Sequence, residues 1–355
     1  MDILGYLRRA VEDGAADLFI VAGSQVSEKV EKQMRNIGED RLMPKDSEAL
    51  IADLYHQAGR SMDYCKNNKK DNFSLSVPGL ARFRVSVFRQ RGSLAAVARV
   101  IQFGIPDAEK MEIPEQALML ADEVRGLVLV TGLAGSGKSV TEACMIDRIN
   151  RSRDAHIMTI ENPIEFLHRN VRCIVSQQEV AIDVDDTVTA IYDSLQQAPD
   201  VLFLSELNGC EAMEAAITAA ETGRLVIATV YSQNVVSAVE FFIHAFPSDR
   251  HEGIRMRLSN VLQGVICQQL LPGLSGILFP AFEVMRVNRV IRSQIRENNL
   301  EEIFKEIQAG VRGGMLPMDQ SILNEFNRKR ITKETALEYA VNREDMRRKL
   351  WVIAE

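Results

Sequence analysis

The sequence predicts an α/β fold in two domains. The chain has 355 residues, more than one compact core usually holds. Hydrophobic residues make up 46% and charged residues 26%, an ordinary mixture for a globular protein. After about residue 115, apolar strand-like runs alternate with helical stretches. That alternation is typical of a parallel sheet covered by helices on both faces.

The first hundred residues predict a small α+β domain. A helical pattern over 3–12 ends at Asp13-Gly14, a strand pattern follows at 16–23, and helical spacing returns over 47–59. Residues 73–101 alternate apolar and polar side chains, with turn signals between them, and predict a β-meander. We therefore expect a first domain at 1–101, a proline-containing linker at 102–115 and a second domain at 116–355.

The second domain opens with strands and helices in alternation and becomes mostly helical from about Asn234. The predicted strands lie within 126–132, 156–161, 201–207 and 224–230. The predicted helices between them lie within 137–150, 186–197 and 210–223. In the last third one further strand candidate lies within 276–285.

Composition excludes several classes of protein. A net charge of −7 argues against a general nucleic-acid binder, which needs a basic face. The five cysteines contain no C-x-x-C pair, which favours reduced thiols in a cytosolic protein over a metal site or disulfides. The N-terminus reads as a charged amphipathic helix and not as a signal peptide. No run of 18 apolar residues predicts a membrane span, so we expect no direct membrane insertion.

A phosphate-binding loop is the strongest motif. Residues Gly132 to Ser139 match G-x-x-x-x-G-K-S, between an apolar strand pattern and a proline-free helix. In such loops the backbone N–H groups surround the phosphates, the lysine reaches the β and γ oxygens, and the hydroxyl ligates Mg²⁺. An ordinary strand-to-helix turn has no need of Lys138 and three glycines. The predicted nucleotide-binding residues here are Gly132, Gly135, Ser136, Gly137, Lys138, Ser139 and Val140.

Two acids follow predicted strands of the same domain. Glu206 ends the run "DVLFLSE" and Glu161 ends "IMTIE". Ligands of open α/β sheets bind at the carboxyl ends of strands, so both acids are expected near the loop. One carboxylate can position Mg²⁺ and the other can activate water. Each alone would also be an ordinary solvated acid at a strand end.

These motifs, in this order and spacing, resemble the secretion ATPases of the GspE/PilT family. The segments that carry the resemblance are "GLVLVTGLAGSGKS", "IMTIENPIEFLH", "APDVLFLSEL" and "AAITAAETGRLVIATV". It is closest to the type IV pilus retraction ATPases of the PilT type and covers nearly the whole chain. The resemblance implies a PAS-like N-terminal domain and a RecA-like P-loop ATPase domain with a helical C-terminal part. "VIRSQI", at 290–295, resembles that family's "AIRNLI" element.

The retraction subtype is inferred from two absences. Pilus extension and type II secretion ATPases carry an added N-terminal region and usually a tetracysteine zinc module, which follows a "QRL"-like helix. Here residues 265–284 run through that place with a single cysteine, and the N-terminal domain pattern begins at once. Both features favour the retraction type.

The resemblance implies a hexameric motor that hydrolyses ATP with Mg²⁺. Glu161 would be the catalytic glutamate, and Ser139 and Glu206 would hold the metal. Arg84 and Arg99, which could also be solvated strand residues, match arginines that approach the nucleotide. The ring, possible also as a hetero-oligomer with a paralogue, would be cytoplasmic and peripheral at the inner face of the cell membrane, where an inner-membrane pilus platform protein would hold it.

The sequence departs from the family pattern close to the chemistry. The departing positions are Val140 after the loop, Asn162 after the catalytic glutamate, Tyr192 and Gln196 for arginines, Ser205, Asn208 and Gly209 around Glu206, and Arg224 and Tyr231 for histidines. Phosphoryl transfer depends on positive charge against the transition state, so turnover should suffer more than binding. Arg224 could supply part of that charge.

Two interpretations follow from this mixture. The first is a divergent retraction ATPase with slow hydrolysis, favoured by the retained Lys138, Glu161 and Glu206. The second is a nucleotide-binding, nearly inactive regulatory or scaffold subunit of a pilus or secretion system, favoured by the lost arginines and histidines. An unrelated metabolic P-loop enzyme is disfavoured because no second-substrate motif is visible.

Overall fold

The chain forms two compact units in the computed structural model. The structure describes residues 2–30, 33–63, 65, 69–101, 104–274 and 276–353. One unit comprises Met1–Gly104 with Glu165–His168, and the other comprises Ile105–Ile164 with Arg169–Glu355. The domain limits expected from the sequence stay predictions, and residues 102 and 103 of the expected linker lie outside the described residues.

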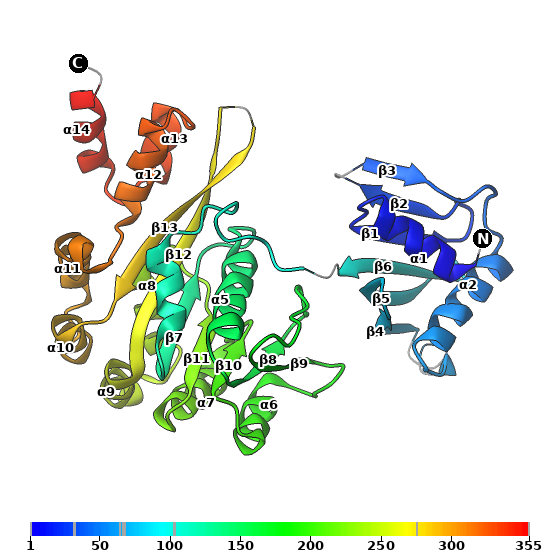
Figure 1. Cartoon of the computed structure of the whole chain (residues 1–355), viewed down its shortest axis with the longest axis horizontal. Coiled ribbons are helices and arrows are strands. Elements are labelled where there is room, and N and C mark those ends of the chain that lie inside the picture. Colours follow the sequence, from blue (N-terminus) through cyan, green and yellow to red (C-terminus); the bar gives the residue numbers. More distant parts are fainter. Residues whose placement is uncertain are drawn as a thin grey trace. The chain divides into compact units, whose positions relative to one another are not determined.

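The first unit is a six-stranded sheet with helices on one face (Figure 1). Its elements are α1 (Ile3–Glu12), β1 (Asp17–Val21), β2 (Ser27–Val30), β3 (Gln33–Asn36), α2 (Pro44–Gln57), β4 (Lys70–Val77), β5 (Ala81–Gln90) and β6 (Ser93–Ile101). The strand order is β3-β2-β1-β6-β5-β4, and neighbouring strands run antiparallel. The expected first helix, first strand and β-meander are present.

Side-chain periodicity explains which face of this sheet is covered. In α1 the buried residues Ile3, Leu7 and Ala10 recur at helical spacing, and the Asp2 side chain caps the helix by accepting from the Gly5 amide at 2.8 Å. In the strands alternate residues such as Leu18 and Val85 are fully buried in the same core. The opposite face of the strands is left to polar and partly exposed residues.

The second unit contains the larger sheet and the remaining helices. Its strands are β7 (Gly126–Thr131), β8 (His156–Glu161), β9 (Ile174–Glu179), β10 (Val201–Leu204), β11 (Leu225–Thr229), β12 (Leu262–Pro272) and β13 (Leu278–Arg286). Its helices are α4 (Glu115–Leu118), α5 (Lys138–Ser152), α6 (Thr187–Ser194), α7 (Gly209–Glu221), α8 (Val235–His244), α9 (His251–Val261), α10 (Arg289–Glu297), α11 (Ile303–Ala309), α12 (Met318–Asn327), α13 (Lys333–Tyr339) and α14 (Arg343–Ile353).

The sheet of this unit has the order β13-β12-β7-β11-β10-β8-β9. All neighbouring pairs are parallel except β12 and β13, which form an antiparallel hairpin at one edge. The predicted parallel sheet and the strand candidate within 276–285 are confirmed, the latter as β13, but a second strand in the last third was missed. Residues 262–272 form β12, because this segment pairs with β7 on one side and β13 on the other.

Both faces of the sheet are buried. In β7 Leu127 and Leu129 belong to one core, and Val128 and Val130 belong to the other. Helices α7 and α8 pack on the first core, while α5 packs on the second. This burial on two faces explains why the strand reads as an uninterrupted apolar run.

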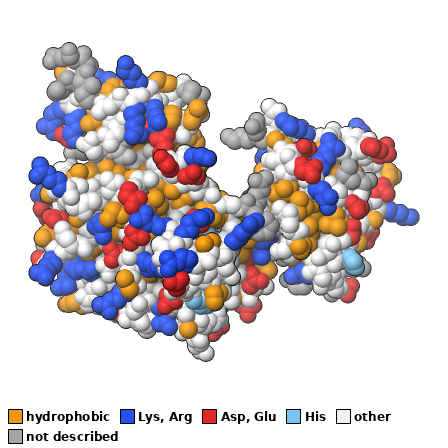
Figure 2. Space-filling model, in the orientation of Figure 1, with side chains coloured by type: hydrophobic (Ala, Val, Ile, Leu, Met, Phe, Trp, Pro, Cys, Tyr) orange, Lys and Arg blue, Asp and Glu red, His pale blue; other side chains and the backbone are white. Residues whose placement is uncertain are grey.

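On the face seen in Figure 2, lysine and arginine side chains are interspersed with acidic and uncharged ones. None of the helices in the described part of the chain combines the length and apolar character that crossing a bilayer requires.

Candidate nucleotide site

The predicted site residues of the second unit meet at one edge of its sheet. Strands β7, β11, β10 and β8 are neighbours and parallel, so their carboxyl ends share an edge. The phosphate loop follows β7, and Tyr231 follows β11. Glu206 follows β10, and Glu161 is the last residue of β8. The structure therefore gathers the loop and both acids where open α/β sheets bind ligands.

Close approach of β12 requires two glycines in the loop. Gly132 has a φ of +146°, and a Cβ there would lie 2.3 Å from the Gln268 carbonyl oxygen. Gly137 has a φ of +88°, and a Cβ there would lie 2.8 Å from Gln268 Nε2. Gln268 is itself held because its Oε1 accepts from Thr141 Oγ1 at 2.7 Å. Side chains at these positions would collide with β12 or distort the loop.

The loop fits a phosphate group on two observations. The Ser136 hydroxyl is buried, and no partner for it exists among the described residues. The first amides of α5, those of Lys138 and Ser139, have no intrahelical acceptor because they belong to its first turn. Donors of both kinds suit an anion at the N-terminus of a helix. The roles of the individual loop residues stay predictions.

Lys138 is held inside the loop. Its Nζ donates to the carbonyl oxygens of Gly132 at 2.9 Å and Leu133 at 3.0 Å. The same ammonium lies 4.7 Å from the centre of the Tyr231 ring, a cation–π distance. Only 8% of Lys138 is exposed. The lysine charge is thus placed beside the loop by contacts that a phosphate could replace.

Glu161 is buried and oriented by two donors. Thr159 Oγ1 donates to its Oε1 at 2.6 Å, and Gln177 Nε2 of β9 donates to the same oxygen at 2.9 Å. Residues 159 and 161 share a face of β8, which brings the hydroxyl to the carboxylate. The next residue, Asn162, donates its amide to Ser205 Oγ at 2.9 Å, which connects the ends of β8 and β10. These contacts fix the carboxylate that the sequence predicts to be catalytic.

Glu206 and Ser139 present polar groups without internal partners. Both residues are half-buried, and neither side chain forms a hydrogen bond within the described ranges. A carboxylate and a hydroxyl at this edge are oxygen donors of the kind that Mg²⁺ accepts together with nucleotide oxygens and water. The metal-binding role of the pair stays a prediction.

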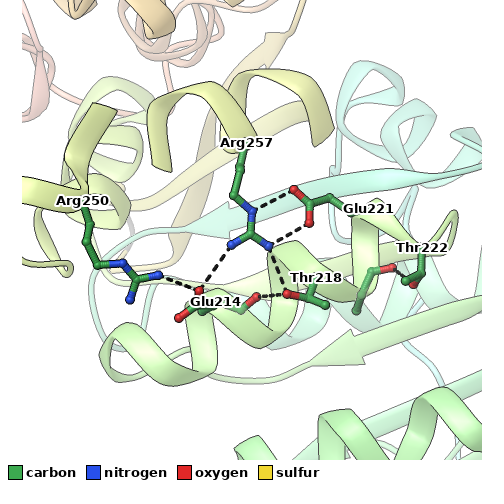
Figure 3. Close-up of polar contacts among 7 residues, drawn as sticks. Glu214, Thr218, Glu221, Thr222, Arg250 and Arg257 are labelled. Carbon is green, nitrogen blue, oxygen red and sulfur yellow. Dashed lines mark hydrogen bonds and ion pairs between the residues drawn. The ribbon is translucent and has the colours of Figure 1, made fainter. Parts of the chain in front are cut away.

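The helix that follows Glu206 is braced by an ion-pair network (Figure 3). Arg257 of α9 reaches Glu221 Oε2 at 2.7 Å and Glu214 Oε1 at 3.4 Å, both on α7. Arg250 donates to the same Glu214 oxygen at 2.6 Å, and this bond lowers the pKa of the Glu214 carboxyl. The groups are partly exposed, so each pair stabilises only modestly. Together they fix α9 against α7.

Two contacts at this edge were missed from the sequence. Glu142 of α5, 3% exposed, accepts a short hydrogen bond from Thr229 Oγ1 at the end of β11. Thr131 Oγ1 accepts from the Ser232 amide at 2.8 Å, across 101 residues of chain. The sequence could have indicated Glu142, because it follows Lys138 by four residues and therefore lies on the same face of the helix. Both contacts attach the segment after β11 to the loop elements.

Arg224 and Gln196, two of the departures from the family pattern, lie at the opposite edge of the sheet from the phosphate loop. Arg224 precedes β11, and its guanidinium donates to the Leu195 carbonyl at 3.0 Å and to Thr222 Oγ1 at 2.7 Å. Gln196 lies in the short 3₁₀ turn Leu195–Gln197, whose last carbonyl contacts His156 at the start of β8. Within one chain these two residues therefore lie away from the phosphate loop. Tyr192 of α6 is exposed.

The two arginines predicted in the first unit are direct cross-strand neighbours. Arg84 of β5 lies opposite Arg99 of β6, and Arg99 lies opposite Asp17 of β1. Arg99 Nε donates to Asp17 Oδ1 at 2.9 Å, a bond that raises the pKa of Arg99. The pair occupies the face of the sheet that α1 and α2 leave uncovered. Its approach to a nucleotide stays a prediction.

Comparisons with known proteins agree with this architecture. The sequence profile of the family described as "Type II/IV secretion system protein" matches residues 5–313. The chain is 36% identical over 348 residues to the type IV pilus ATPase PilU of Pseudomonas aeruginosa, covering 98% of this chain and 91% of that protein.

Two further matches concern PilT. Identity is 36% over 340 residues to the pilus retraction ATPase PilT of Pseudomonas aeruginosa, covering 96% of this chain and 98% of that one. A crystal structure of the pilus retraction motor PilT with bound ADP superposes with a TM-score of 0.89 at 34% identity, covering 98% of this chain and 99% of the other. The chain therefore belongs to the type II/IV secretion system protein family.

Proposed function

We propose that this protein is a type IV pilus motor ATPase of the retraction type that binds MgATP firmly and hydrolyses it slowly. The observation that carries the proposal is the phosphate loop set beside Glu161 and Glu206 at one sheet edge. It is supported by similarity along nearly the whole chain to PilT, a retraction motor whose crystal structure holds ADP.

Each residue has a distinct task in this proposal. Loop amides and Ser136 bind the β-phosphate, and Lys138 leaves the Gly132 and Leu133 carbonyls to contact the β and γ oxygens. Ser139 and Glu206 hold Mg²⁺, which neutralises charge that develops on the phosphates. Glu161, already held by Thr159 and Gln177, orients or activates the attacking water.

Slow turnover follows from missing positive charge. An arginine finger can contribute about 10³- to 10⁵-fold to phosphoryl transfer. Arg224, which could have replaced lost charge, is bound to Leu195 and Thr222 at the opposite edge of the same chain. The affinity for nucleotide depends mainly on the loop, Lys138 and Mg²⁺, and none of these is changed from the motif.

We propose that the working form is a hexameric ring at the inner face of the cell membrane, docked on a pilus platform protein. Head-to-tail interfaces close into rings when their rotation allows. The deciding experiment is ATP turnover by the purified protein, with its mass measured by light scattering in Mg²⁺ and an ATP analogue. We expect low turnover and a mass near six subunits. A strict monomer at tens of micromolar would argue against a homomeric motor.

Restoring the family residues should raise turnover. Tyr231 lies beside Lys138, so Tyr231→His should increase the rate of ATP hydrolysis in any oligomeric state. Gln196 lies at the opposite edge of the sheet. Gln196→Arg should therefore increase the rate only in an assembled ring, where the new arginine could face the site of a neighbouring subunit. Together the two changes should raise turnover by about 10-fold or more. Tyr231→Phe, which keeps the ring on Lys138, is the matched control and should leave the rate low.

The alternative is a regulatory or scaffold subunit that binds nucleotide and scarcely hydrolyses it. The loss of the family histidines and arginines favours this alternative. No measurable turnover, with normal nucleotide binding and assembly beside an active paralogue, would select it.

A further inference from the structure

A buried carboxylate joins the starts of two helices near the nucleotide site. Glu283, on β13, is 2% exposed, and its Oε2 accepts from the Val235 amide at 2.9 Å. The Met318 amide faces the same carboxylate and, like the Val235 amide, lowers its pKa. Val235 and Met318 are the first residues of α8 and α12, where amides lack intrahelical acceptors. Pro317 precedes α12 and offers no side-chain cap, and Glu283 lies beside this start of the helix, lining the same cavity as Pro317 and Met318.

The start of α8 is continuous with the segment that touches the phosphate loop. This segment is residues 231–234, between β11 and α8. Its Tyr231 ring covers the Lys138 ammonium, and its Ser232 is bound to Thr131 at the end of β7. Ser232 Oγ also donates to the Asn234 carbonyl at 2.9 Å. A contact that fixes Val235 therefore also fixes one end of this segment.

The start of α12 is connected to the C-terminal helices in the same manner. Asp319 accepts from the Val341 amide at 2.7 Å and the Asn342 amide at 3.0 Å, between α13 and α14. A cavity of about 500 Å³ separates these elements and is lined by Glu283, Asp319, Arg343 and Glu344 among others. Glu283 thus holds the end of the segment 231–234, Asp319 holds the last helices, and both carboxylates line the cavity between them.

We propose that Glu283 is a positioning residue for the phosphate site: it holds the segment 231–234 in the arrangement that accepts nucleotide, and it couples that segment to the C-terminal helices. The inference rests on the proposed nucleotide binding. Among the described residues Glu283 forms no hydrogen bond with the loop or Lys138, so it acts through Val235 and the segment before it. The C-terminal helices, in turn, bias the site through Met318 and the same carboxylate.

This arrangement makes the coupling sensitive to pH. Burial raises the pKa of Glu283 to about 7, and the amides of Val235 and Met318 oppose that rise. The other titratable groups that face it are Cys267 on β12, Asp319 on α12, and Arg343 and Glu344 across the cavity. Burial raises the pKa of Cys267, so its thiol stays neutral near pH 7. The ionised carboxylate accepts from the Val235 amide, and interacts with the Met318 amide, more favourably than the protonated one does.

The test is the affinity of the full-length protein for the Mg²⁺ complex of a non-hydrolysable ATP analogue, at pH 6 and pH 8. Compared with Glu283→Gln, the unaltered protein should lose on the order of 5-fold more affinity on going from pH 8 to pH 6. The variant shares the titration of the nucleotide itself, so the comparison removes that contribution. Glu325→Gln is the matched control, because Glu325 is a buried acid of α12 that pairs with Arg328 and Arg330.

A second variant keeps the test decisive if Glu283→Gln folds poorly. Val235→Pro removes the donor and leaves Glu283 in place. Proline is tolerated at the first position of a helix, and Asn234 before it is extended, with φ −154° and ψ 173°. We expect it to reproduce the loss of pH dependence, with Glu325→Gln behaving as the unaltered protein.

The outcomes separate this inference from the proposed function. Equal pH dependence in the unaltered protein and in both site variants would overturn the positioning role and leave nucleotide binding intact. A control variant that loses the pH dependence to the same degree would overturn it too, because general destabilisation would then suffice. Absence of nucleotide binding at both pH values would overturn both proposals.

Discussion

Glu161→Gln should abolish the basal ATP hydrolysis of this protein and leave its affinity for ATP nearly unchanged. A general base contributes about 10²- to 10⁴-fold to a reaction, and a low basal rate should fall below detection without it. The amide oxygen of glutamine can still accept from Thr159 and Gln177, so the local structure should persist. Phosphate release from MgATP and calorimetric binding of an ATP analogue measure the two quantities.

The control for this variant is Glu221→Gln. Glu221 also belongs to the second unit, but it pairs with Arg257 on the surface of α7. Its loss should leave turnover unaffected. A basal rate that survives Glu161→Gln would place the catalytic carboxylate elsewhere, with Glu206 the first residue to examine. Turnover as fast as that of a family member with all its arginines and histidines would show that other residues had replaced them.

The strands that the sequence predicted are those whose burial leaves a clear pattern. β7, β8, β10 and β11 are buried on both faces, so each reads as an apolar run between helical stretches. Strand β3, "QMRN", is exposed throughout, and β9, "IVSQQE", lies at an edge with mostly polar, half-buried residues. Their strand conformation comes from pairing with neighbours, which local sequence does not encode.

The site residues also divide into those that local sequence reveals and those that depend on contacts between distant segments. The loop motif at Gly132–Ser139 could be recognised from the sequence because it occupies eight consecutive residues. Gln268 and Thr229 could not, because each reaches its partner on α5 across more than 80 residues of chain. The position of Arg224 also needed the fold: the sequence left open a role beside the phosphates, and the strand direction puts it at the opposite edge.

Within one chain, Arg224 and Gln196 lie away from the loop, and Lys138 supplies the positive charge that the described residues show inside it. The Lys138 ammonium is held there by the Gly132 and Leu133 carbonyls and by the Tyr231 ring. In the proposed function, nucleotide binding exchanges those contacts for phosphate oxygens. A tyrosine at this position can stabilise the lysine in the loop, but it cannot provide the positive charge of a protonated histidine.

Lys138→Ala should lower the affinity for ATP by about 10- to 100-fold. Hydrogen bonds to charged groups contribute about 1.5–3 kcal/mol, and 1.4 kcal/mol corresponds to a tenfold change in affinity. Lys138→Met removes the same charge but keeps most of the side-chain volume beside Tyr231, so it should show the same loss with less effect on thermal stability. Lys305→Ala is the control. It removes an exposed lysine of α11 that pairs with Glu302, the residue before this helix, and it should leave the affinity unchanged.

Calorimetry on the three variants, with thermal unfolding measured in parallel, separates charge from folding. A loss of affinity in Lys138→Ala alone, with Lys138→Met binding normally, would indicate that packing and not charge is responsible. Equal binding in the unaltered protein and both Lys138 variants, or none in any of them, would contradict the assignment of Gly132–Ser139 as the nucleotide site. The expected pattern places the β and γ oxygens of ATP against Lys138 once it has left the Gly132 and Leu133 carbonyls.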